Sequence, residues 1–239
     1  MVVRAALIAN RDDADPGLVG KSLRRRGYSF VEFIREDHLN WPNLDGIDLV
    51  VAMGSAWSTY WDHVAEPVQA EQRLLAEAME RGIGVLGICF GGQQLSVTLG
   101  GVVTKAQSPE IGWFPVENLP ETAHLAPKCL TEGPWMQWHY DAFSVPAGAT
   151  ALAQSPAGPQ AMVCGTALGL QFHPEANESI VRFWASGTGE DELNAHDLQE
   201  EQILAATRLH LADATRRCDE LVEWFLHHVA QETAQRHME

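Results

Sequence analysis

Residues 84–93 read Gly-Val-Leu-Gly-Ile-Cys-Phe-Gly-Gly-Gln, an apolar run that ends in Gly-x-Cys-x-Gly and passes directly into a helical pattern. This is the cysteine counterpart of the Gly-x-Ser-x-Gly nucleophile elbow, a sharp turn that projects its central side chain above a sheet. Glycines flank the cysteine because side chains would clash in so tight a turn. The segment predicts a buried strand over 84–88, an elbow at Cys89 and a helix through about Leu99.

The chain before this segment alternates between strand and helix patterns. Strands are predicted over 5–9, 28–34 and 47–52, and helices over 18–26 and 64–81. Each helix ends just before a glycine, the residue that most often follows a helix C-terminus. This β-α-β-α-β order predicts an α/β fold: an open, mostly parallel sheet with helices on both faces.

The rest of the chain divides into a strand-rich part and a helical part. Short strands, read as antiparallel additions to the sheet, are predicted over 113–117, 142–145, 150–153, 161–164 and 168–172. A short helix to Ser186 stops at Gly-Thr-Gly (187–189), a polar acidic stretch follows, and a long helical segment runs over about 199–232. Its apolar stripe comprises Leu204, Leu211, Cys218, Leu221, Phe225 and Val229. We expect a catalytic domain over 1–186 and a helical extension over 187–239 packed on it, with a lid or a dimer surface as alternatives.

The overall charge narrows the classes of partner. Sixteen basic and 32 acidic side chains give a formal charge of −16, which disfavours binding to nucleic acid or to anionic membranes. No apolar run approaches the ~18 residues that span a bilayer. The apolar N-terminal stretch is too short for a signal peptide and reads as a buried strand. We expect a cytoplasmic protein.

The four cysteines, Cys89, Cys129, Cys164 and Cys218, include no Cys-x-x-Cys pair. A zinc knuckle or a thioredoxin-type redox site is therefore not indicated, and a reducing cytosol would keep all four as free thiols. Cys89 alone has a chemical context, because a helix N-terminus stabilises a thiolate and the N–H of Phe90 is placed to donate to an oxyanion. The same glycine-rich pattern also occurs where a strand meets a helix by packing alone.

A second segment supplies the missing partners of a nucleophile. Residues 169–175 read Gly-Leu-Gln-Phe-His-Pro-Glu, a buried strand that ends in His-Pro-Glu. A nucleophilic cysteine needs a base, and the base needs a group that orients it. Neighbouring parallel strands deliver side chains to the same carboxyl edge of a sheet. The two segments together therefore predict that His173 takes the thiol proton and that Glu175 holds the other ring nitrogen.

With these two motifs the chain resembles the class I glutamine amidotransferases, the family that includes the glutaminase part of GMP synthetase. The resemblance rests on 87–93 and 171–175, with weaker matches at 110–113 and 138–141, and it covers roughly residues 3–183. It implies a flavodoxin-like sheet and a Cys89-bound γ-glutamyl thioester formed from glutamine with release of ammonia. It also implies that Gln93 contacts the substrate and that no cofactor is used.

One loop departs from the family pattern. The family carries Gly-Gly-Pro after the third strand, where the loop supplies a second oxyanion-hole amide, but residues 52–58 here read Ala-Met-Gly-Ser-Ala-Trp-Ser. A backbone donor at Gly54 or Ser55 remains feasible, since the chemistry uses an N–H and not a side chain. Trp57, Tyr60 and Trp61 follow this loop, either as a reshaped pocket wall or as ordinary packing, which the sequence slightly favours.

Other polar residues carry weaker signals. His139 and Asp141 are candidates for binding substrate, although a strand-end histidine is more often structural. His210, His227 and His228 have no carboxylate at metal-ligand spacing, so no metal site is predicted. No Gly-x-x-x-x-Gly-Lys-Ser/Thr motif occurs, so a P-loop for ATP is not indicated.

Three functions follow from this set of residues. One is a glutaminase that passes ammonia to a separate synthase, because 239 residues leave no room for a domain that activates an acceptor. The second is a stand-alone γ-glutamyl peptidase or γ-glutamyl-amine hydrolase with no acceptor partner. The third is a catalytically silent binding protein, which the intact Cys-His-Glu set disfavours. A homo-oligomer is compatible with all three.

Overall fold

The computed structural model describes residues 3–230 and has one main sheet. Within these residues, its eight strands lie in the order β2 (Tyr28–Ile34), β1 (Val3–Ala9), β3 (Leu49–Ala52), β4 (Gly84–Ile88), β10 (Ala167–Leu170), β9 (Gly158–Cys164), β8 (Thr150–Ser155) and β6 (Glu117–Asn118). The first five are parallel to one another. This arrangement confirms the predicted fold class, and the strand order β2-β1-β3-β4-β10 is that of flavodoxin-like sheets.

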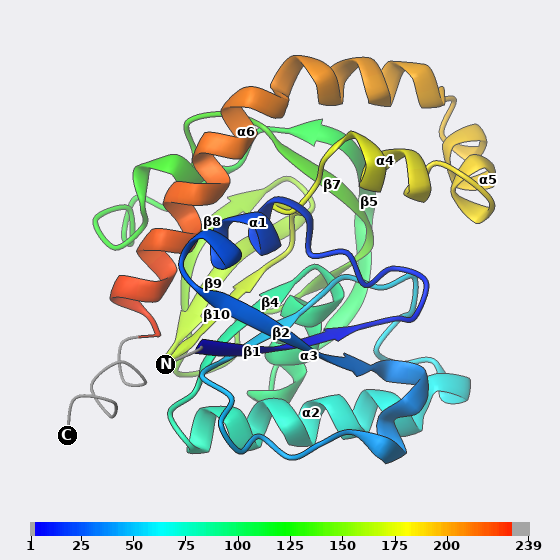
Figure 1. Cartoon of the computed structure of the whole chain (residues 1–239). Coiled ribbons are helices and arrows are strands. Elements are labelled where there is room, and N and C mark those ends of the chain that lie inside the picture. The colour runs from blue at the N-terminus through cyan, green and yellow to red at the C-terminus, as the bar shows by residue number, and fades with distance from the viewer. Residues whose placement is uncertain (1–2, 231–239) are drawn as a thin grey trace.

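Helices cover both faces of the sheet, as predicted (Figure 1). On one face α1 (Gly17–Arg25) and α6 (Glu200–His228) pack on apolar side chains of the parallel strands. On the other face α2 (Ala65–Glu80) and α3 (Phe90–Thr98) pack on the intervening side chains of the same strands. Because successive side chains of a strand point to opposite faces, fully apolar strands such as β3 and β4 supply both cores.

The part of the fold after α3 differs from the prediction. β6, β8 and β9 extend the main sheet as antiparallel strands, but β10, expected over 168–172 as a further antiparallel addition, is parallel to β4. β5 (Val103–Phe114) and β7 (Trp135–Phe143) form a separate two-stranded sheet, linked to the segment after β10 by a bridge between Met136 and His173. The strand expected over 113–117 falls on the end of β5 and the start of β6, and the one expected over 142–145 is only the end of β7.

One side of β7 is buried, but that side carries Gln137, His139 and Asp141, and the other carries mostly apolar and aromatic residues. The sequence therefore lacks the alternation of apolar and polar residues that signals a half-buried strand.

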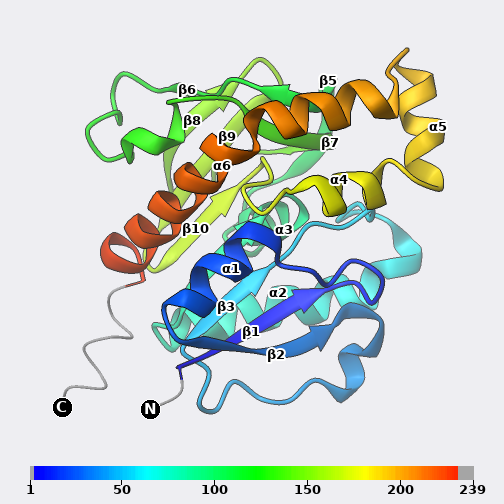
Figure 2. The ribbon, with the colours of Figure 1, turned by 45° about the horizontal axis from the view of Figure 1, so that its top comes forward.

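The segment after β10 is more helical than predicted. α4 (Glu178–Trp184) begins at Asn177, whose side chain accepts from the N–H groups of Ser179 and Ile180. The acidic stretch expected to be irregular forms α5 (Thr188–Ala195), which lies beyond the end of α4 (Figure 2). Two acidic residues in its first turn favour a helix start through the helix dipole, a signal that outweighs the glycines.

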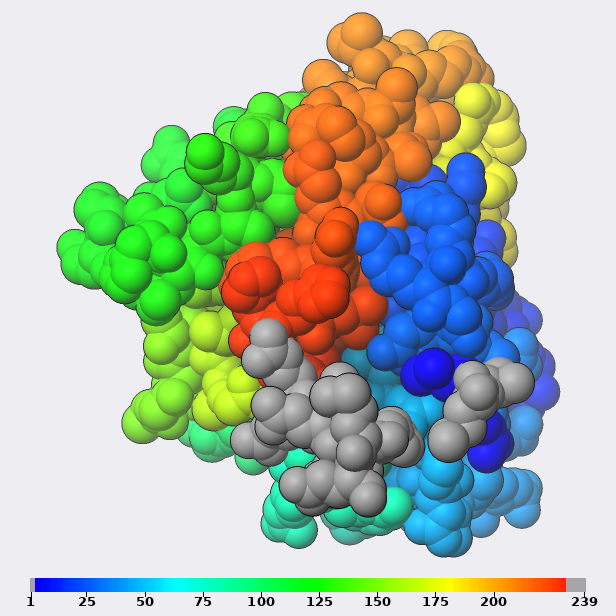
Figure 3. All heavy atoms as spheres, turned by 60° about the vertical axis from the view of Figure 1, so that its left-hand side comes forward, coloured from blue at the N-terminus to red at the C-terminus, as the bar shows by residue number. Residues whose placement is uncertain are grey.

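α6 follows the predicted apolar stripe. Leu204, Cys218, Leu221 and Phe225 are buried, and the helix lies across the molecule between α1 and the segment before β7 (Figure 3). Asp219 fixes its position by accepting from Ser22 and by pairing with arginines at the end of α1. Residues 231 and 232 of the predicted segment lie outside the described residues. The division into domains at residue 186 stays a prediction.

The described helices include none that is both long enough and apolar enough to span a membrane.

The burial of α6 predicts its contribution to stability. Phe225 is completely buried, so Phe225→Ala is expected to lower the free energy of unfolding by about 3–5 kcal/mol through lost apolar contact and a cavity. Leu209 lies on the same helix with 77% of its surface exposed. Leu209→Ala is expected to change the free energy of unfolding by less than about 0.5 kcal/mol. Urea unfolding measures both variants. Equal losses would mean that α6 does not pack on the core as described.

Candidate active site

Cys89 lies at the turn between β4 and α3. Its backbone has φ +49° and ψ −107°, a conformation that costs energy for any residue with a side chain. The turn is tight enough that a Cβ at Gly91 would lie 2.1 Å from the carbonyl oxygen of Ala52, and one at Gly87 would lie 2.5 Å from that of Gly91. The predicted elbow is therefore present, and its glycines are required by close backbone contact.

Two polar groups contact the sulfur. Gln171 is fully buried and its Nε2 donates to Cys89 Sγ at 3.6 Å, while Sγ lies 3.9 Å from the carbonyl oxygen of Trp138. The sequence analysis quoted Gln171 only as part of a motif and did not foresee this contact.

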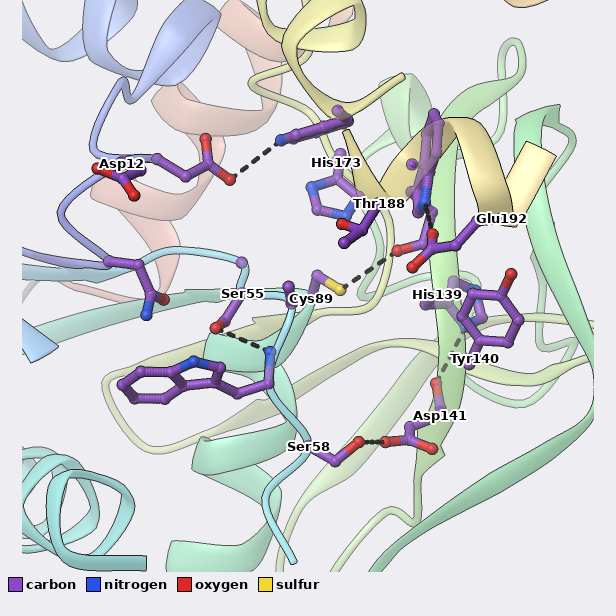
Figure 4. Close-up of a pocket in the computed structure, with 18 of the residues that line it drawn as sticks. Asp12, Ser55, Ser58, Cys89, His139, Tyr140, Asp141, His173, Thr188 and Glu192 are labelled. Carbon is purple, nitrogen blue, oxygen red and sulfur yellow. Dashed lines mark hydrogen bonds between the residues drawn. The ribbon is translucent and has the colours of Figure 1, made fainter. Parts of the chain in front are cut away.

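His173 and Glu175 lie at the end of the neighbouring strand. β10 pairs with β4 in parallel, with Leu170 opposite Ile88, so the segments that follow the two strands reach the same edge of the sheet. A Cβ at Gly54 would contact both residues, at 2.9 Å from His173 Cε1 and 3.7 Å from Cys89 Cβ. Figure 4 shows His173 beside Cys89. The sheet thus brings together the two segments on which the catalytic prediction depends.

A short hydrogen bond joins the imidazole to the carboxylate. His173 Nδ1 lies 2.7 Å from Glu175 Oε1, and both side chains are buried. Glu175 Oε2 has no hydrogen-bond partner among residues 3–230, so the ring is the group that most directly stabilises this carboxylate. The contact fixes the ring and leaves Nε2 as the nitrogen available for chemistry.

The surroundings of His173 favour its protonated form. Burial lowers the pKa of His173, but the charge of Glu175 and then that of Cys89 raise it by more, so the pKa lies well above its ordinary value. By contrast, burial raises the pKa of the Cys129 thiol to about 12 and also raises that of Cys218. Those two thiols are packing groups, whereas Cys89 lies beside the imidazole of His173.

Three backbone N–H groups belong to residues that follow β3 or β4, close to Cys89. Phe90 is the first residue of α3, so its N–H has no acceptor within that helix. Gly54 and Ser55 follow β3 and line the same cavity as Cys89. Neither N–H donates to any group within residues 3–230. These three amides are the ones predicted to form an oxyanion hole.

The altered loop is part of the cavity wall. Trp57, Tyr60 and Trp61 all line the cavity, and Tyr60 and Trp61 keep 47% and 40% of their surface exposed. The preference for ordinary packing was therefore wrong for Tyr60 and Trp61, whereas Trp57 lines the cavity and also packs against the cluster of Val64, Val68 and Phe90. Ser58 Oγ and Tyr60 Oη donate to the two carboxylate oxygens of Asp141 at 2.6 and 2.8 Å, which anchors the loop to β7.

Gln93 and His139 occupy the inner part of the cavity. Gln93 Nε2 donates to the carbonyl oxygen of Asp141 at 3.2 Å. His139 is buried, with Nδ1 3.0 Å from the carbonyl oxygen of Asp141 and Nε2 3.1 Å from Glu110 Oε2. Glu110 also accepts from Ser155 and Gln160. His139 thus lines the cavity while its ring is held by structural hydrogen bonds.

The cavity itself has a volume of about 940 Å³. It opens at the point between β1 and β3 where the strand order reverses, the usual ligand site of such sheets. Its outer wall comes from α5 and the segment before it, including Thr188 and Glu192 (Figure 4). The sequence analysis did not foresee this wall, because it expected no helix over 188–195.

Two tryptophans of the cavity also escaped the sequence analysis. Trp184 packs against the His173 ring, with centroids 4.5 Å apart, and its Nε1 donates to Asp13 at 3.0 Å. Trp138 Nε1 donates to Glu192 at 2.6 Å, which ties α5 to β7. Trp138 was quoted only as part of a motif, and a tryptophan gives no signal of such a role in the sequence, since this residue serves most often as core.

Residues 3–230 contain no cluster of three or more histidine, cysteine, aspartate or glutamate side chains arranged to hold a metal ion. His210 packs against Trp113, and His228 bonds the carbonyl oxygen of Trp224. All four cysteines are free thiols.

The comparison with protein families identifies the fold with a known group. A family model described as glutamine amidotransferase class-I matches residues 57–180, which is more than half of the chain. The chain belongs to the class I glutamine amidotransferase family. This is a family of enzymes that hydrolyse glutamine, and the resemblance inferred from residues 87–93 and 171–175 is confirmed.

Individual relatives cover the chain to different extents. A GMP synthase (glutamine-hydrolysing) of Aeropyrum pernix is 35% identical over 141 residues, which are 58% of this chain and 25% of that protein. A glutamine amidotransferase-like protein of Salmonella typhimurium is 30% identical over 156 residues, 59% of this chain and 64% of that protein. The chain therefore spans about a quarter of the first relative and less than two thirds of the second.

A solved structure matches almost from end to end. The crystal structure of a glutamine amidotransferase of Thermotoga maritima has a TM-score of 0.82 and 27% identity, covering 95% of this chain and 99% of that one. The match extends well beyond residue 180, so that protein is similar to this family member in the helical C-terminal part as well.

The contact between His173 and Glu175 makes a prediction about pH. Glu175→Gln removes the negative charge that raises the pKa of His173 against the lowering effect of burial. The pKa of His173 should therefore fall below its wild-type value. In the wild type the pKa of His173 is higher in the folded protein than in the unfolded chain, so protonation of His173 stabilises the fold. This contribution to the free energy of unfolding is fully present below the unfolded pKa of about 6.5 and is lost as pH rises through the folded pKa. NMR titration of the histidine Cε1–H resonances measures the shift.

Glu110→Gln is the matched control, because Glu110 makes the corresponding contact with His139. It should leave the His173 titration unchanged. An unaltered His173 pKa in Glu175→Gln would contradict the assignment of the raised pKa to Glu175.

Proposed function

We propose that the protein hydrolyses the γ-carboxamide of glutamine or of a γ-glutamyl compound, with Cys89 as nucleophile, His173 as acid and base, and Glu175 as the group that orients His173. The observation that carries the proposal is the buried 2.7 Å contact between His173 and Glu175, next to a cysteine in an elbow conformation. A cation beside the sulfur and a carboxylate behind the cation are what an activated thiol requires.

In the first step the Cys89 thiolate attacks the γ-carbonyl carbon, and the carbonyl oxygen becomes an oxyanion. The N–H of Phe90 and those of Gly54 and Ser55 stabilise that charge. Protonated His173 then gives its Nε2 proton to the nitrogen, the C–N bond breaks, and ammonia or an amine leaves. The product on the enzyme is a γ-glutamyl thioester.

In the second step His173 is neutral and acts as a base. It takes a proton from a water molecule, whose oxygen attacks the thioester carbon. The C–S bond breaks, glutamate leaves, and the thiolate–imidazolium pair is restored. The charge of Glu175 stabilises the imidazolium that forms in this step. The same imidazolium is the acid of the first step, so loss of the Glu175 charge should slow both steps.

For substrate binding we propose Gln93, His139 and Asp141. All three line the cavity that contains Cys89. Their side chains are held by hydrogen bonds to Gln171, Glu110 and Ser58, respectively, so they offer fixed rather than mobile contacts to a glutamyl group.

A second candidate is hydrolysis of γ-glutamyl amines larger than glutamine. The cavity, at about 940 Å³, lies near the upper end of the ~300–1,000 Å³ that drug-sized ligands occupy. Exposed aromatic side chains, among them Tyr60, Trp61 and Phe183, line it. A cavity of this size and character accommodates an organic leaving group, which ammonia does not require.

If ammonia is the product in the cell, a separate synthase is the proposed acceptor. The Aeropyrum pernix relative is named as a GMP synthase, and this chain spans a quarter of its length. The proposed acceptor of the ammonia is thus a class of enzyme, one that activates a substrate for amination.

Replacing the nucleophile tests the chemistry. Cys89→Ala is expected to abolish both glutamate release and the trapping of γ-glutamyl hydroxamate by hydroxylamine, because no thioester forms without the sulfur. Cys164→Ala is the matched control: that thiol is half-buried in β9, and its loss should leave both measurements unchanged. Hydroxamate formation by Cys89→Ala would assign the nucleophile elsewhere.

Substrate preference separates the two candidates. The purified protein is assayed for glutamate release from glutamine and from a series of γ-glutamyl amines of increasing size. A kcat/KM that rises with the size of the amine supports the second candidate, because the outer cavity then binds the leaving group. A kcat/KM highest for glutamine, or turnover only after a co-expressed synthase is added, supports the ammonia donor.

A further inference from the structure

Arg35 lies behind the floor of the cavity and is completely buried. It is the first residue of η1 (Arg35–Asn40), which follows β2. Its five N–H donors make five hydrogen bonds. Two go to Glu71: Nε donates to Oε2 at 2.8 Å and Nη2 donates to Oε1 at 3.1 Å. Nη2 also donates to the Met53 carbonyl at 2.8 Å, and Nη1 donates to the Gly54 carbonyl and to Asn10 Oδ1, each at 2.9 Å. Its orientation is therefore fixed.

Two of these bonds determine the direction of the loop after β3. In a planar trans peptide the C=O and N–H groups point in opposite directions. The carbonyl groups of Met53 and Gly54 point at the guanidinium, so the N–H groups of the same two peptide units, those of Gly54 and Ser55, point away from it. Both residues line the cavity, so these N–H groups are turned to the side on which Cys89 lies.

The same guanidinium contacts the other half of the proposed oxyanion hole. Its central carbon lies 4.8 Å from the centre of the Phe90 ring, and the N–H of Phe90 is the donor that follows Cys89. Arg35 thus joins the loop after β3 to the first residue of α3, two segments that approach the sulfur from different strands.

Stability alone does not account for this ion pair. Glu71 of α2 is also completely buried, and the cost of removing two charges from water commonly matches or exceeds their mutual attraction. Apolar side chains of similar volume often replace a buried ion pair at little or no cost in stability. They could not, however, hold two neighbouring carbonyl groups in one direction.

We propose that Arg35 is a positioning residue that pre-organises the oxyanion hole, with Glu71 as its counter-ion. The inference rests on the proposed function, since it concerns the transition state of that reaction. Arg35 touches neither the substrate nor the sulfur; it acts through the peptide units that carry the N–H donors.

The test compares two reactions of Cys89 in Arg35→Lys. Lysine keeps the charge but cannot bond a carboxylate and two carbonyl groups in the planar arrangement of a guanidinium. With the preferred γ-glutamyl amide, kcat is expected to fall by about 10²–10³-fold, the effect of losing one oxyanion donor, with KM changed by less than about threefold. Alkylation of Cys89 by iodoacetamide needs the thiolate but develops no oxyanion, so its rate constant should stay within about twofold of the wild-type value.

Arg217→Lys is the matched control. Arg217 is also completely buried, bonds the carbonyl groups of Gly133 and Pro134, pairs with Asp213 and stacks over Trp135. Its replacement removes the same kinds of contact away from the cavity. It should lower the melting temperature in the same way but leave kcat unchanged.

Three results would overturn the inference. The first is wild-type kcat in Arg35→Lys. The second is a parallel fall in the rates of hydrolysis and alkylation, which would mean that Arg35→Lys acts on the thiolate. The third is an equal loss of kcat in Arg217→Lys, which would mean that the loss follows from lower stability. If Arg35→Lys does not fold, Glu71→Gln takes its place, with a smaller fall in kcat and unchanged alkylation expected.

Failure of the proposed function gives a different result. If the wild-type protein hydrolyses no γ-glutamyl amide, the positioning role is decided by a crystal structure of whichever of these two variants folds. Rotation of the peptide between Met53 and Gly54 supports it, and an unchanged carbonyl direction overturns it.

Discussion

Ile88 of β4 lies opposite Leu170 of β10, and the N–H of Cys89 donates to the carbonyl oxygen of Leu170 at 2.8 Å. Both strands are fully buried, so their register is held by packing on both faces. A shift of one residue would turn every side chain after Leu170 to the opposite face and remove His173 from the sulfur. Everything proposed about the reaction depends on this pairing, because it brings the segments of Cys89 and His173 to the same edge of the sheet.

Around this pairing the site has two layers with different physical roles. The inner layer holds the charges that would take part in the reaction, those of Cys89, His173 and Glu175. The outer layer, formed by Arg35 and Glu71, contains a second pair of opposite charges, which contacts two backbone carbonyl groups, the side chain of Asn10 and the ring of Phe90. Local strain at Cys89 is tolerated because the packing around it, including the close contact of α3 with β3, over-determines the turn.

The sequence predicted the parallel half of the fold closely and the rest less well. β2 and β4 have the predicted bounds, since apolar strands next to glycine-terminated helices give strong local signals. β7 and α5 were missed: the buried side of β7 carries three polar residues, and α5 is polar, so neither shows the expected period of apolar residues. The residues of the proposed triad could be named from motifs, but Trp184, Glu192 and Arg35 could not, because their roles come from contacts across the fold.

The residues that line the cavity span the chain from Asn10 to Glu192. During synthesis on the ribosome, Cys89 emerges 84 positions before His173, the residue that would activate it. In the proposed mechanism Cys89 would become reactive only once folding brings His173 beside it. An incomplete chain, in which the imidazole and the outer wall of α5 have not yet been made, would then react less readily with electrophiles.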